Sequence, residues 1–454
     1  MKAYRTAAFI FRRDLRLADN TALNAALAEA ERVAAVFIFD DRQIEPHAYQ
    51  SRPGLRFMFE SLQDLREQLA ARDGRLFAFR GEPERALHAL HAGLGVEAVY
   101  VNRDYTPFSR ERDSRLAAVC RDLGVAWHAQ ADVLLTEPEQ VLNDHGQPYQ
   151  VFTPFHRRAR QFAPPAPRGL SPGSFVTEYL TYQEPAWPDS TWDGATFRGG
   201  RGAALRCLDA LEHCRDYAAE RDFPALAATS GLSAYLKFGC CSIREAYAAV
   251  ENRFGPEHPL LRQFYWRDFF CHIGFHYPRV FGQAFQARFQ QVAWRRDEAG
   301  FWAWAEGRTG FPIVDAAMRE LNETGQMHNR LRMVTASFLT KDLHIDWRWG
   351  ERYFAQRLVD YDPCLNNGNW QWAASTGCDA QPYFRVFNPW LQQRKFDPDC
   401  VYIKRWLPEA RKYTVEDLHD WPRRCKPGAY PPPMLDHAER SRLIKDLFAA
   451  AARS

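Results

Sequence analysis

The sequence predicts an α/β domain with a doubly wound parallel sheet, joined by a long linker to an all-α domain. Three observations support this fold class. Short apolar runs alternate with helical stretches up to residue 130, prolines interrupt residues 131–203, and helical periodicity dominates residues 204–454. A chain of 454 residues is also too long for a single hydrophobic core.

The first domain (residues 1–130) contains five apolar runs that predict strands, and three amphipathic stretches that predict helices. The strand candidates are 7–11, 33–39, 76–79, 96–101 and 125–128, and the helix candidates are 55–71, 83–92 and 109–123. Such alternation predicts a parallel sheet with helices on both faces. The first strand is followed by Arg12-Arg13-Asp14, without the Gly-rich turn of a nicotinamide site.

Any ligand of this sheet should bind beyond the carboxyl ends of its strands. The polar residues expected there are Asp40, Asp41, Asn102, Arg103, Asp104 and Tyr105. An ordinary solvated group of loops explains them equally well. In the linker (residues 131–203), seven prolines lie between 154 and 188, so we expect one short helix over 149–160 and otherwise extended chain.

The composition is that of a soluble globular protein, with 46% hydrophobic and 25% charged residues. No run of 18 apolar residues predicts a membrane span, and no signal peptide is recognisable. The ten cysteines include no Cys-x-x-Cys pair, which favours reduced thiols in a cytoplasm over disulfides or zinc, and no other metal motif occurs. The net charge of +3 does not by itself indicate nucleic-acid binding.

The most informative stretch of the helical domain (residues 204–454) runs from Asp360 to Ser375. Two acids and three asparagines precede two tryptophans, and Pro363 and Gly368 predict a loop that leads into a helix. Residues two apart on a helix point about 200° apart, so Trp370 and Trp372 should face different surroundings. Core packing would explain the tryptophans alone. Beside so many polar groups, however, a polar cofactor is the better interpretation.

Other clusters in this domain are weaker signals. Thr229-Ser230-Gly231-Leu232-Ser233 offers hydroxyls to a phosphate but could be a simple helix cap. Eight of the fourteen tryptophans fall between residues 266 and 372. Residues 381–412 carry seven basic side chains and three acids, interleaved with aromatics that include Tyr383 and Phe384. This basic run is either solvated surface or a phosphate-binding face.

Four segments together carry a resemblance. They are Phe11–Asn20, Thr309–Arg319, Met327–Met333 and Asn366–Ser375, and the similarity spans nearly the whole chain. The sequence resembles the cryptochrome/photolyase family, most closely the microbial enzymes that split cyclobutane pyrimidine dimers. The resemblance implies a cytoplasmic, monomeric flavoprotein without a membrane contact, which binds FAD and UV-damaged DNA and works by light-driven electron transfer.

By motif match, the FAD phosphates would contact Tyr217, Thr229, Ser230, Gly231, Leu232 and Ser233. The remainder of FAD would be surrounded by Trp266, Arg267, Asn329, Arg332, Asp360, Asp362 and Asn366. Arg332 should pair with Asp360, because neighbouring carboxylates need a cation to stay ionised. Asn366 would place an uncharged amide near the flavin N5.

The resemblance also implies an electron relay of Trp370, Trp347 and Trp294, ending at the protein surface. The lesion would leave the duplex and stack between Trp266 and Trp372. The full set of DNA contacts would be Arg221, Gln263, Trp266, Asn329, Arg330, Met333 and Trp372. A second, antenna chromophore is expected near Arg56 and Asp104, and the residues after the fourth strand favour a deazaflavin or flavin over a folate.

Four alternatives remain open. A cryptochrome photoreceptor often has a long C-terminal tail, whereas only about forty residues follow Lys412. A photolyase for pyrimidine–pyrimidone photoproducts would have histidines where this chain has Asn329 and Met333, and the single-strand-specific branch lacks the tryptophan present at 266. A DNA-binding protein without enzymatic activity would contain no flavin. Gln263 stands where many dimer photolyases have glutamate, which bears on repair yield.

Overall fold

The computed structural model describes residues 2–178, 180, 197–380, 382, 385–425, 428 and 430–451. These residues divide into two compact units. The first unit takes the described residues up to 180, together with 197–212 and 230–276. The second takes 213–229 and the described residues from 277 onward. The domain boundaries expected from the sequence, at 130 and 203, stay predictions.

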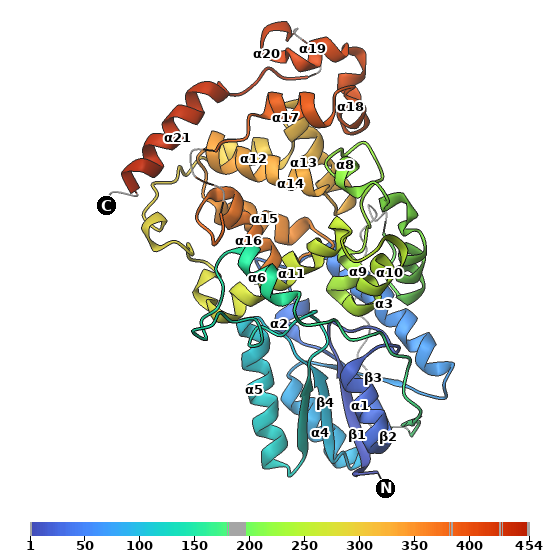
Figure 1. Cartoon of the computed structure of the whole chain (residues 1–454). Helices are drawn as coiled ribbons and strands as arrows, with labels where there is room; N and C mark the ends of the chain where they lie inside the picture. The colour runs from blue at the N-terminus through green and yellow to red at the C-terminus, as the bar shows by residue number, and fades with distance from the viewer. Residues whose placement is uncertain are drawn as a thin grey trace. The chain divides into compact units, whose positions relative to one another are not determined.

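The first unit is built on a parallel sheet. Its strands are β1 (Tyr4–Phe11), β2 (Ala30–Phe39), β3 (Leu76–Arg80), β4 (Ala98–Asn102), β5 (Ala126–Gln130) and β6 (Ser174–Phe175). Five of them follow the order β3-β2-β1-β4-β5, and β6 pairs in parallel with β2. Figure 1 labels β1, β2, β3 and β4 of this sheet. The doubly wound parallel sheet predicted from the apolar runs is therefore confirmed.

Helices cover both faces of this sheet because neighbouring residues of each strand point to opposite sides. Phe9 and Phe11 of β1 belong to one apolar core, whereas Ile10 belongs to the other. The first core includes residues of α1 (Thr21–Glu29) and α3 (Arg52–Ala70), and the second includes residues of α4 (Pro83–Leu94) and α5 (Pro107–Asp122). The three predicted helices of the first domain are all present.

A buried polar network lies where β1 and β4 end. The Asn102 amide donates to Asp14 Oδ2 at 2.5 Å and to Asn20 Oδ1 at 2.8 Å. Arg16 donates to Asp132 Oδ2 at 2.6 Å, and Arg244 to Asp132 Oδ1 at 2.7 Å. Burial raises the pKa of Asp14 to about 6. Of the polar residues that the sequence places beyond the strand ends, Asn102 is therefore held within the protein by this network.

The remaining α-helices of the first unit are α2 (Asp41–Ile44), α6 (Phe152–Ala159), α7 (Arg201–Asp209), α9 (Ser233–Phe238), α10 (Ile243–Phe254) and α11 (Pro259–His276). The short helix expected over 149–160 is confirmed by α6. The expectation of otherwise extended surface chain is wrong at β6, where Phe175 and Val176 are buried. A two-residue strand has no period of its own, so only its pairing with β2 defines it.

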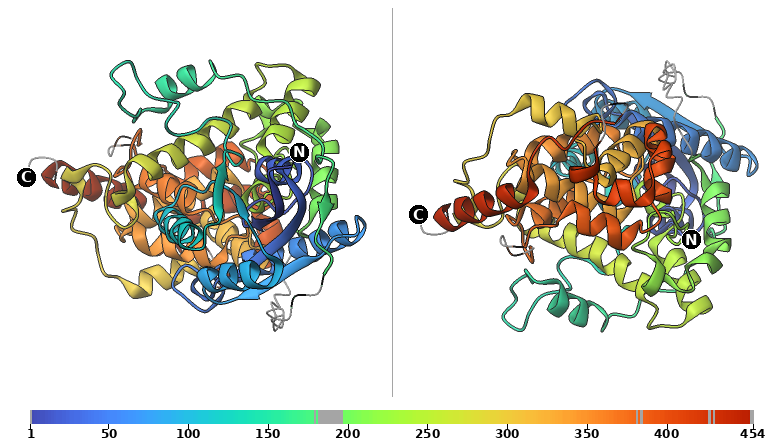
Figure 2. Two further views of the ribbon diagram at one scale, coloured as in Figure 1. Left: turned by 90° about the horizontal axis from the view of Figure 1, so that it is seen from below. Right: turned by 90° about the horizontal axis from the view of Figure 1, so that it is seen from above.

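The second unit is helical, as predicted. Its α-helices are α8 (Tyr217–Glu220), α12 (Glu298–Ala305), α13 (Pro312–Thr324), α14 (Asn329–Ser337), α15 (Trp347–Arg357), α16 (Pro363–Ala374), α17 (Pro389–Phe396), α18 (Val401–Trp406), α19 (Val415–His419), α20 (Trp421–Arg424) and α21 (His437–Ala451). Short 3-10 turns cover Pro278–Val280, Ala287–Phe289 and Pro408–Lys412, and a π-helical turn, Phe338–Asp342, follows α14. Figures 1 and 2 show α21, in red, along the edge of this unit.

Two further expectations concern the chain as a whole. All ten cysteines are free thiols, which agrees with the absence of a disulfide framework predicted from their spacing. Among the residues that the structure describes, no helix combines the length and the apolar character needed to cross a membrane.

Candidate cofactor and lesion site

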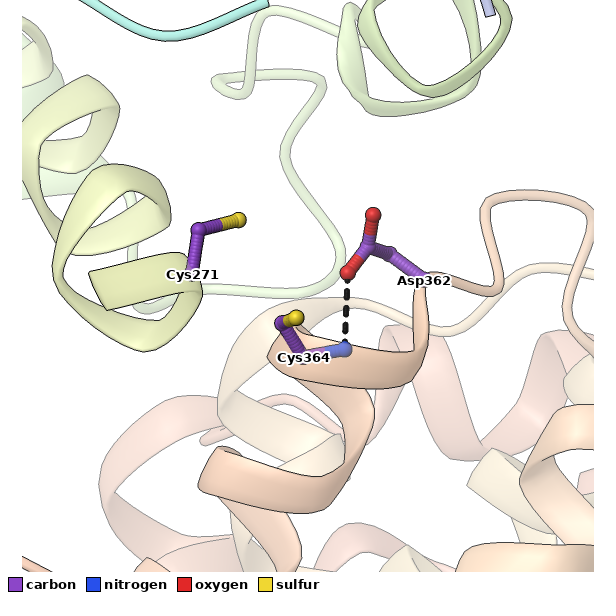
Figure 3. A group of neighbouring side chains, drawn as sticks. All are labelled: Cys271, Asp362 and Cys364. Atoms are coloured by element: carbon purple, nitrogen blue, oxygen red, sulfur yellow. Dashed lines mark hydrogen bonds between the residues drawn. The ribbon is translucent and has the colours of Figure 1, made fainter. Parts of the chain in front are cut away.

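The stretch from Asp360 to Gly368 differs from its predicted form. Helix α16 begins at Pro363, not at Trp370, so the expected loop through Gly368 is wrong. The cause is a strong N-cap. Asp362 Oδ1 accepts a hydrogen bond from the backbone N–H of Cys364 at 2.9 Å (Figure 3) and another from that of Leu365 at 3.1 Å. Proline at the first helical position adds to this start signal.

Asp360 lies just before this cap and forms an ion pair in the second unit. Arg332 Nη2 donates to Asp360 Oδ2 at 2.9 Å and to Oδ1 at 3.2 Å, which confirms the predicted pairing. Arg332 Nε also donates to the Met327 carbonyl at 2.9 Å. The Asp360 side chain is only 6% exposed. Burying a carboxylate is unfavourable because it loses its hydration, and the ion pair with the Arg332 guanidinium offsets this cost.

The amides of α16 hold the helix in place. Asn366 Nδ2 donates to the Glu351 carbonyl at 2.9 Å, and Asn367 Nδ2 donates to Glu351 Oε1 at 3.1 Å. Gln371 Nε2 donates to the Val280 carbonyl and to Asn367 Oδ1, both at 3.0 Å. The protein itself therefore provides partners for Asn367 and Gln371, two polar residues whose anchoring role the sequence did not predict.

The two tryptophans of α16 have different surroundings, as their spacing predicted. Trp370 is 2% exposed, and its ring centroid lies 4.9 Å from that of Phe354 and 6.1 Å from that of Trp304. Trp372 is half-buried. A methyl group on Gly350 would lie 2.1 Å from the Trp370 ring, so only glycine allows α15 to approach this closely.

The other two relay candidates also lie in the second unit. Trp347 is fully buried at the start of α15, after the N-cap Asp346. Trp294 is half-buried, and its ring packs edge-on against Phe448 of α21 at 5.9 Å. The set thus runs from buried to partly exposed positions, the order that a path to the surface requires.

Helix α14 carries three of the predicted lesion contacts, Asn329, Arg330 and Met333. Asn329 is exposed and Met333, one turn later, is half-buried. Arg330 pairs with Asp222 at 2.7 Å and lies 4.4 Å above the Phe396 ring. The Arg221 guanidinium lies 5.7 Å from the centre of the Tyr217 ring, so both predicted DNA-contacting arginines are fixed by neighbours within this unit.

His328 was not among the predicted site residues. Its Nδ1 accepts from the Arg330 N–H at 3.2 Å and caps α14. Burial lowers the pKa of His328 to about 4, which keeps the imidazole neutral at pH 7. A histidine directly before Asn329 at a helix start was the available signal in the sequence.

In the first unit, Gln263, Trp266 and Arg267 share one face of α11. The Trp266 ring stacks on Phe152 with centroids 3.7 Å apart and planes inclined by 6°. Arg267 Nη1 donates to the Val133 carbonyl at 2.5 Å. One face of Trp266 is therefore covered by Phe152, a residue that the sequence did not connect with the site.

The predicted phosphate contacts are divided between the two units: Tyr217 and Thr229 belong to the second unit, and 230–233 belong to the first. In the first unit, Ser230 Oγ accepts from the Leu232 N–H at 3.5 Å, and Gly231 has φ of 65°, a conformation suited to glycine. Ser233 is exposed and begins α9. In the second unit, Tyr217 is buried, and the Thr229 carbonyl lies 3.0 Å from His213 Nε2.

The two antenna candidates belong to the first unit. Asp104 accepts from Arg13 Nη1 at 3.2 Å, from the Tyr105 N–H at 2.8 Å and from Ser109 Oγ at 3.0 Å. The Arg13 guanidinium, opposed by burial, leaves the pKa of Asp104 below its usual range. Arg56 forms an ion pair with Glu60 at 3.0 Å on α3. Both side chains are engaged by protein groups.

The basic run of the second unit lies on α17, α18 and the segment before them. Arg385, Arg394, Lys395 and Arg405 are exposed, and Lys404 is half-buried. Two aromatics of this run, Tyr383 and Phe384, lie outside the described residues. An exposed set of cations is able to contact phosphates, although it carries no base specificity.

Comparisons with known proteins agree with this arrangement. Residues 7–171 match the family model of DNA photolyase, and residues 260–450 match that of the FAD-binding domain of DNA photolyase. The chain is 39% identical to the deoxyribodipyrimidine photo-lyase of Synechococcus sp., over 97% of this chain and 96% of that protein.

Solved structures give the same result. A photolyase from Sulfolobus tokodaii, which holds two FAD molecules, superposes with a TM-score of 0.88 at 41% identity and covers 98% of this chain and 100% of its own. A cryptochrome from Synechocystis sp. superposes with a TM-score of 0.90 at 28% identity, over 98% and 100% of the two chains. The chain belongs to the DNA photolyase family and carries its FAD-binding domain.

Proposed function

We propose that this protein repairs cyclobutane pyrimidine dimers in UV-damaged DNA, using light and bound FAD. The observation that carries the proposal is the Asp360–Arg332 ion pair beside the capped start of α16, within a segment that matches a photolyase FAD-binding domain. The similarity to proteins named deoxyribodipyrimidine photo-lyase supports the reaction class. When bound, FAD supplies light absorption and the electron that opens the dimer.

The types of side chain at the candidate site suit the parts of a flavin dinucleotide. Hydroxyl groups suit its phosphates, and an ion-paired carboxylate with amides suits its ring system. The residues that would hold FAD are Tyr217, Thr229, Ser230, Gly231, Leu232, Ser233, Trp266, Arg267, Asn329, Arg332, Asp360, Asp362 and Asn366. Within this set Arg332 forms an ion pair with Asp360, and Asp362 caps the start of the helix that carries Asn366.

Lesion recognition rests on aromatic surfaces and cations. Trp372 is half-buried and would offer one face to a base that has left the duplex, and the uncovered face of Trp266 would offer another. Arg221, Gln263, Asn329, Arg330 and Met333 would contact the lesion or its flanking backbone. The exposed cations of α17 and α18 would hold the phosphates.

Trp370, Trp347 and Trp294 would return electrons to the site from the surface. Indole is among the most easily oxidised side chains, and this set ends at the half-buried Trp294. No general acid or base takes part, because bond cleavage in the dimer follows electron transfer. His328, neutral at pH 7, fits a role in positioning α14.

For the second chromophore we propose a deazaflavin or flavin near Arg56 and Asp104. The photolyase from Sulfolobus tokodaii contains two FAD molecules, which supports a flavin in this place. We further propose that the protein acts as a monomer in the cytoplasm, where the ten thiols stay reduced.

A spectrum and a repair assay test the proposal. The purified protein should be yellow and should release FAD on denaturation. Under blue light it should restore thymines in an oligonucleotide that contains one cyclobutane dimer, and should leave a pyrimidone photoproduct untouched, because Asn329 and Met333 replace the histidines of that branch. Preferential pyrimidone repair would reverse the assignment of the lesion. A flavoprotein that repairs neither lesion would be a cryptochrome, and a colourless folded protein would contradict the proposal.

A further inference from the structure

A continuous file of aromatic rings leads from Trp370 to the surface through α12. Trp370 and Trp304 have centroids 6.1 Å apart, and Trp304 and Phe301 have centroids 5.7 Å apart. Phe301 in turn lies 5.4 Å from Trp302, whose side chain is 50% exposed. All four rings belong to the second unit, and the sequence did not connect α12 with Trp370.

Trp304 has the surroundings that an electron donor in the protein interior needs. It is fully buried, and its Nε1 donates to the Thr335 carbonyl at 3.0 Å. A carbonyl oxygen facing the indole N–H stabilises a positive charge on the ring, which offsets part of the desolvation cost of burial. Phe301 is too difficult to oxidise to hold the charge itself. It fills the space between two indoles, where it couples them without being oxidised.

Trp302 has the surroundings of a terminus. Water reaches half of its side chain, and Glu298 lies one helical turn before it on the same face of α12, where its carboxylate can stabilise a cation. Glu306, four residues after Trp302 at the C-cap, already pairs with Arg308. Tyr353 also lies 5.8 Å from Trp304, but its hydroxyl donates its single proton to one of two neutral oxygens, Asn322 Oδ1 at 2.7 Å or the Ala305 carbonyl at 3.1 Å. Neither oxygen can accept the proton that an oxidised tyrosine must lose, so Tyr353 makes a poor terminus.

We propose that Trp304 and Trp302 form a second branch of the electron relay, which leaves Trp370 in parallel with Trp347 and Trp294. Trp304 gives one electron to oxidised Trp370, and Trp302 then gives one electron to oxidised Trp304. The Trp302 cation loses its Nε1 proton to water. An external thiol restores the indole by giving one electron and one proton. This inference rests on the proposed function, since light must first oxidise Trp370.

Residue-specific trapping tests the branch in the flavin-loaded protein. A nitroso spin trap is added during blue illumination without thiol, and tandem mass spectrometry locates the adducts. We expect an adduct on Trp302 in the wild type, and its loss both in the dark and in Trp370→Phe, because the charge enters through Trp370. No adduct on Trp302 in illuminated wild type, or one that persists in Trp370→Phe, would overturn the branch.

A kinetic comparison uses the first branch as background. Trp347→Phe interrupts the first branch, so this variant should keep a slower residual photoreduction with external thiol. Adding Trp302→Phe should abolish the residual photoreduction. Adding the control substitution Trp406→Phe should not, because Trp406 lies on α18 and takes no part in the ring contacts that link Trp370, Trp304, Phe301 and Trp302. Equal residual rates in all three variants, or no residual rate in Trp347→Phe, would refute the branch. A wild-type protein that shows no photoreduction would instead refute the proposed relay as a whole.

Discussion

Replacing Trp372 with alanine should weaken lesion binding and leave the electron donors in place. Trp370 is buried, and Trp372 is half-buried against the same core. The substitution therefore removes a stacking surface and some packing, but leaves the Trp370 ring and its contacts with Phe354 and Trp304 in place. Stacking contributes about 1–3 kcal/mol per base, which corresponds to a loss in affinity of about fivefold to somewhat over a hundredfold.

The same change has a modest cost in stability. Truncating a fully buried tryptophan costs about 3–5 kcal/mol, and a half-buried ring should cost roughly half of that. Alanine is also the better helix former, by about 0.5 kcal/mol. The net loss of about 1–2 kcal/mol should leave the protein folded at 25 °C, since domains typically have about 5–15 kcal/mol of unfolding free energy.

Fluorescence anisotropy with a labelled oligonucleotide measures the effect. The Kd for DNA with one cyclobutane dimer should rise, whereas the Kd for undamaged DNA should change little and remain salt-sensitive, because phosphate contacts dominate it. FAD content and photoreduction should stay near wild type. Normal binding of damaged DNA together with loss of FAD would show that Trp372 faces the cofactor, and would refute the assignment of the two faces of α16.

Three further outcomes follow from the structure. Trp370→Phe should abolish photoreduction of oxidised FAD yet permit repair once FAD is reduced chemically; unchanged photoreduction would mean that another residue is the first donor. Arg332→Met should lower the free energy of unfolding by about 2–3 kcal/mol in urea titrations, because the Asp360 carboxylate is left without its cation. The loss should be smaller than for a fully buried pair, because the guanidinium is partly exposed. Burial lowers the pKa of Lys341 to about 7, so unfolding free energy should rise by up to about 1.4 kcal/mol per pH unit above pH 7, up to the ordinary lysine pKa. That stabilisation is lost progressively as pH falls from the ordinary lysine pKa to about 7, and urea titrations from pH 6 to 10 should show a flatter profile for Lys341→Met; parallel profiles would contradict the lowered pKa.

The sheet could be predicted from the sequence because each strand is an apolar run long enough to show its own pattern. Tyr4–Phe11 and Ala30–Phe39 are of this kind. The two residues of β6 are not, since their strand character comes only from pairing with β2. The start of α16 was misplaced because the asparagines and Gly368 suggested a loop, whereas the Asp-Pro start signal at 362–363 outweighs them once the Asp362 carboxylate caps two backbone N–H groups.

In the candidate site, too, some contacts could be predicted from the local sequence and others could not. The Arg332–Asp360 pair was predictable because a carboxylate beside another carboxylate needs a cation, and one arginine of the matching motif was available. The stacking of Phe152 on Trp266 was not predictable. The two residues are more than a hundred positions apart, and the sequence around one gives no indication that it contacts the other. The ion pair of Asp222 with Arg330 is a contact of the same long-range kind.

The anchoring of α16 bears on how the proposed site is preorganised. The sequence suggested that the amides of this stretch need a cofactor as partner, but Asn367 and Gln371 bind protein groups instead. These bonds, with the Asp362 cap, fix the position of the helix without help from a ligand. The conformational entropy of α16 is then lost when the protein folds, so the binding of FAD does not have to compensate for ordering this helix. Trp370 accordingly stays buried and Trp372 stays half-buried without a ligand, which is the condition under which one helix could serve both the proposed relay and the proposed lesion contact.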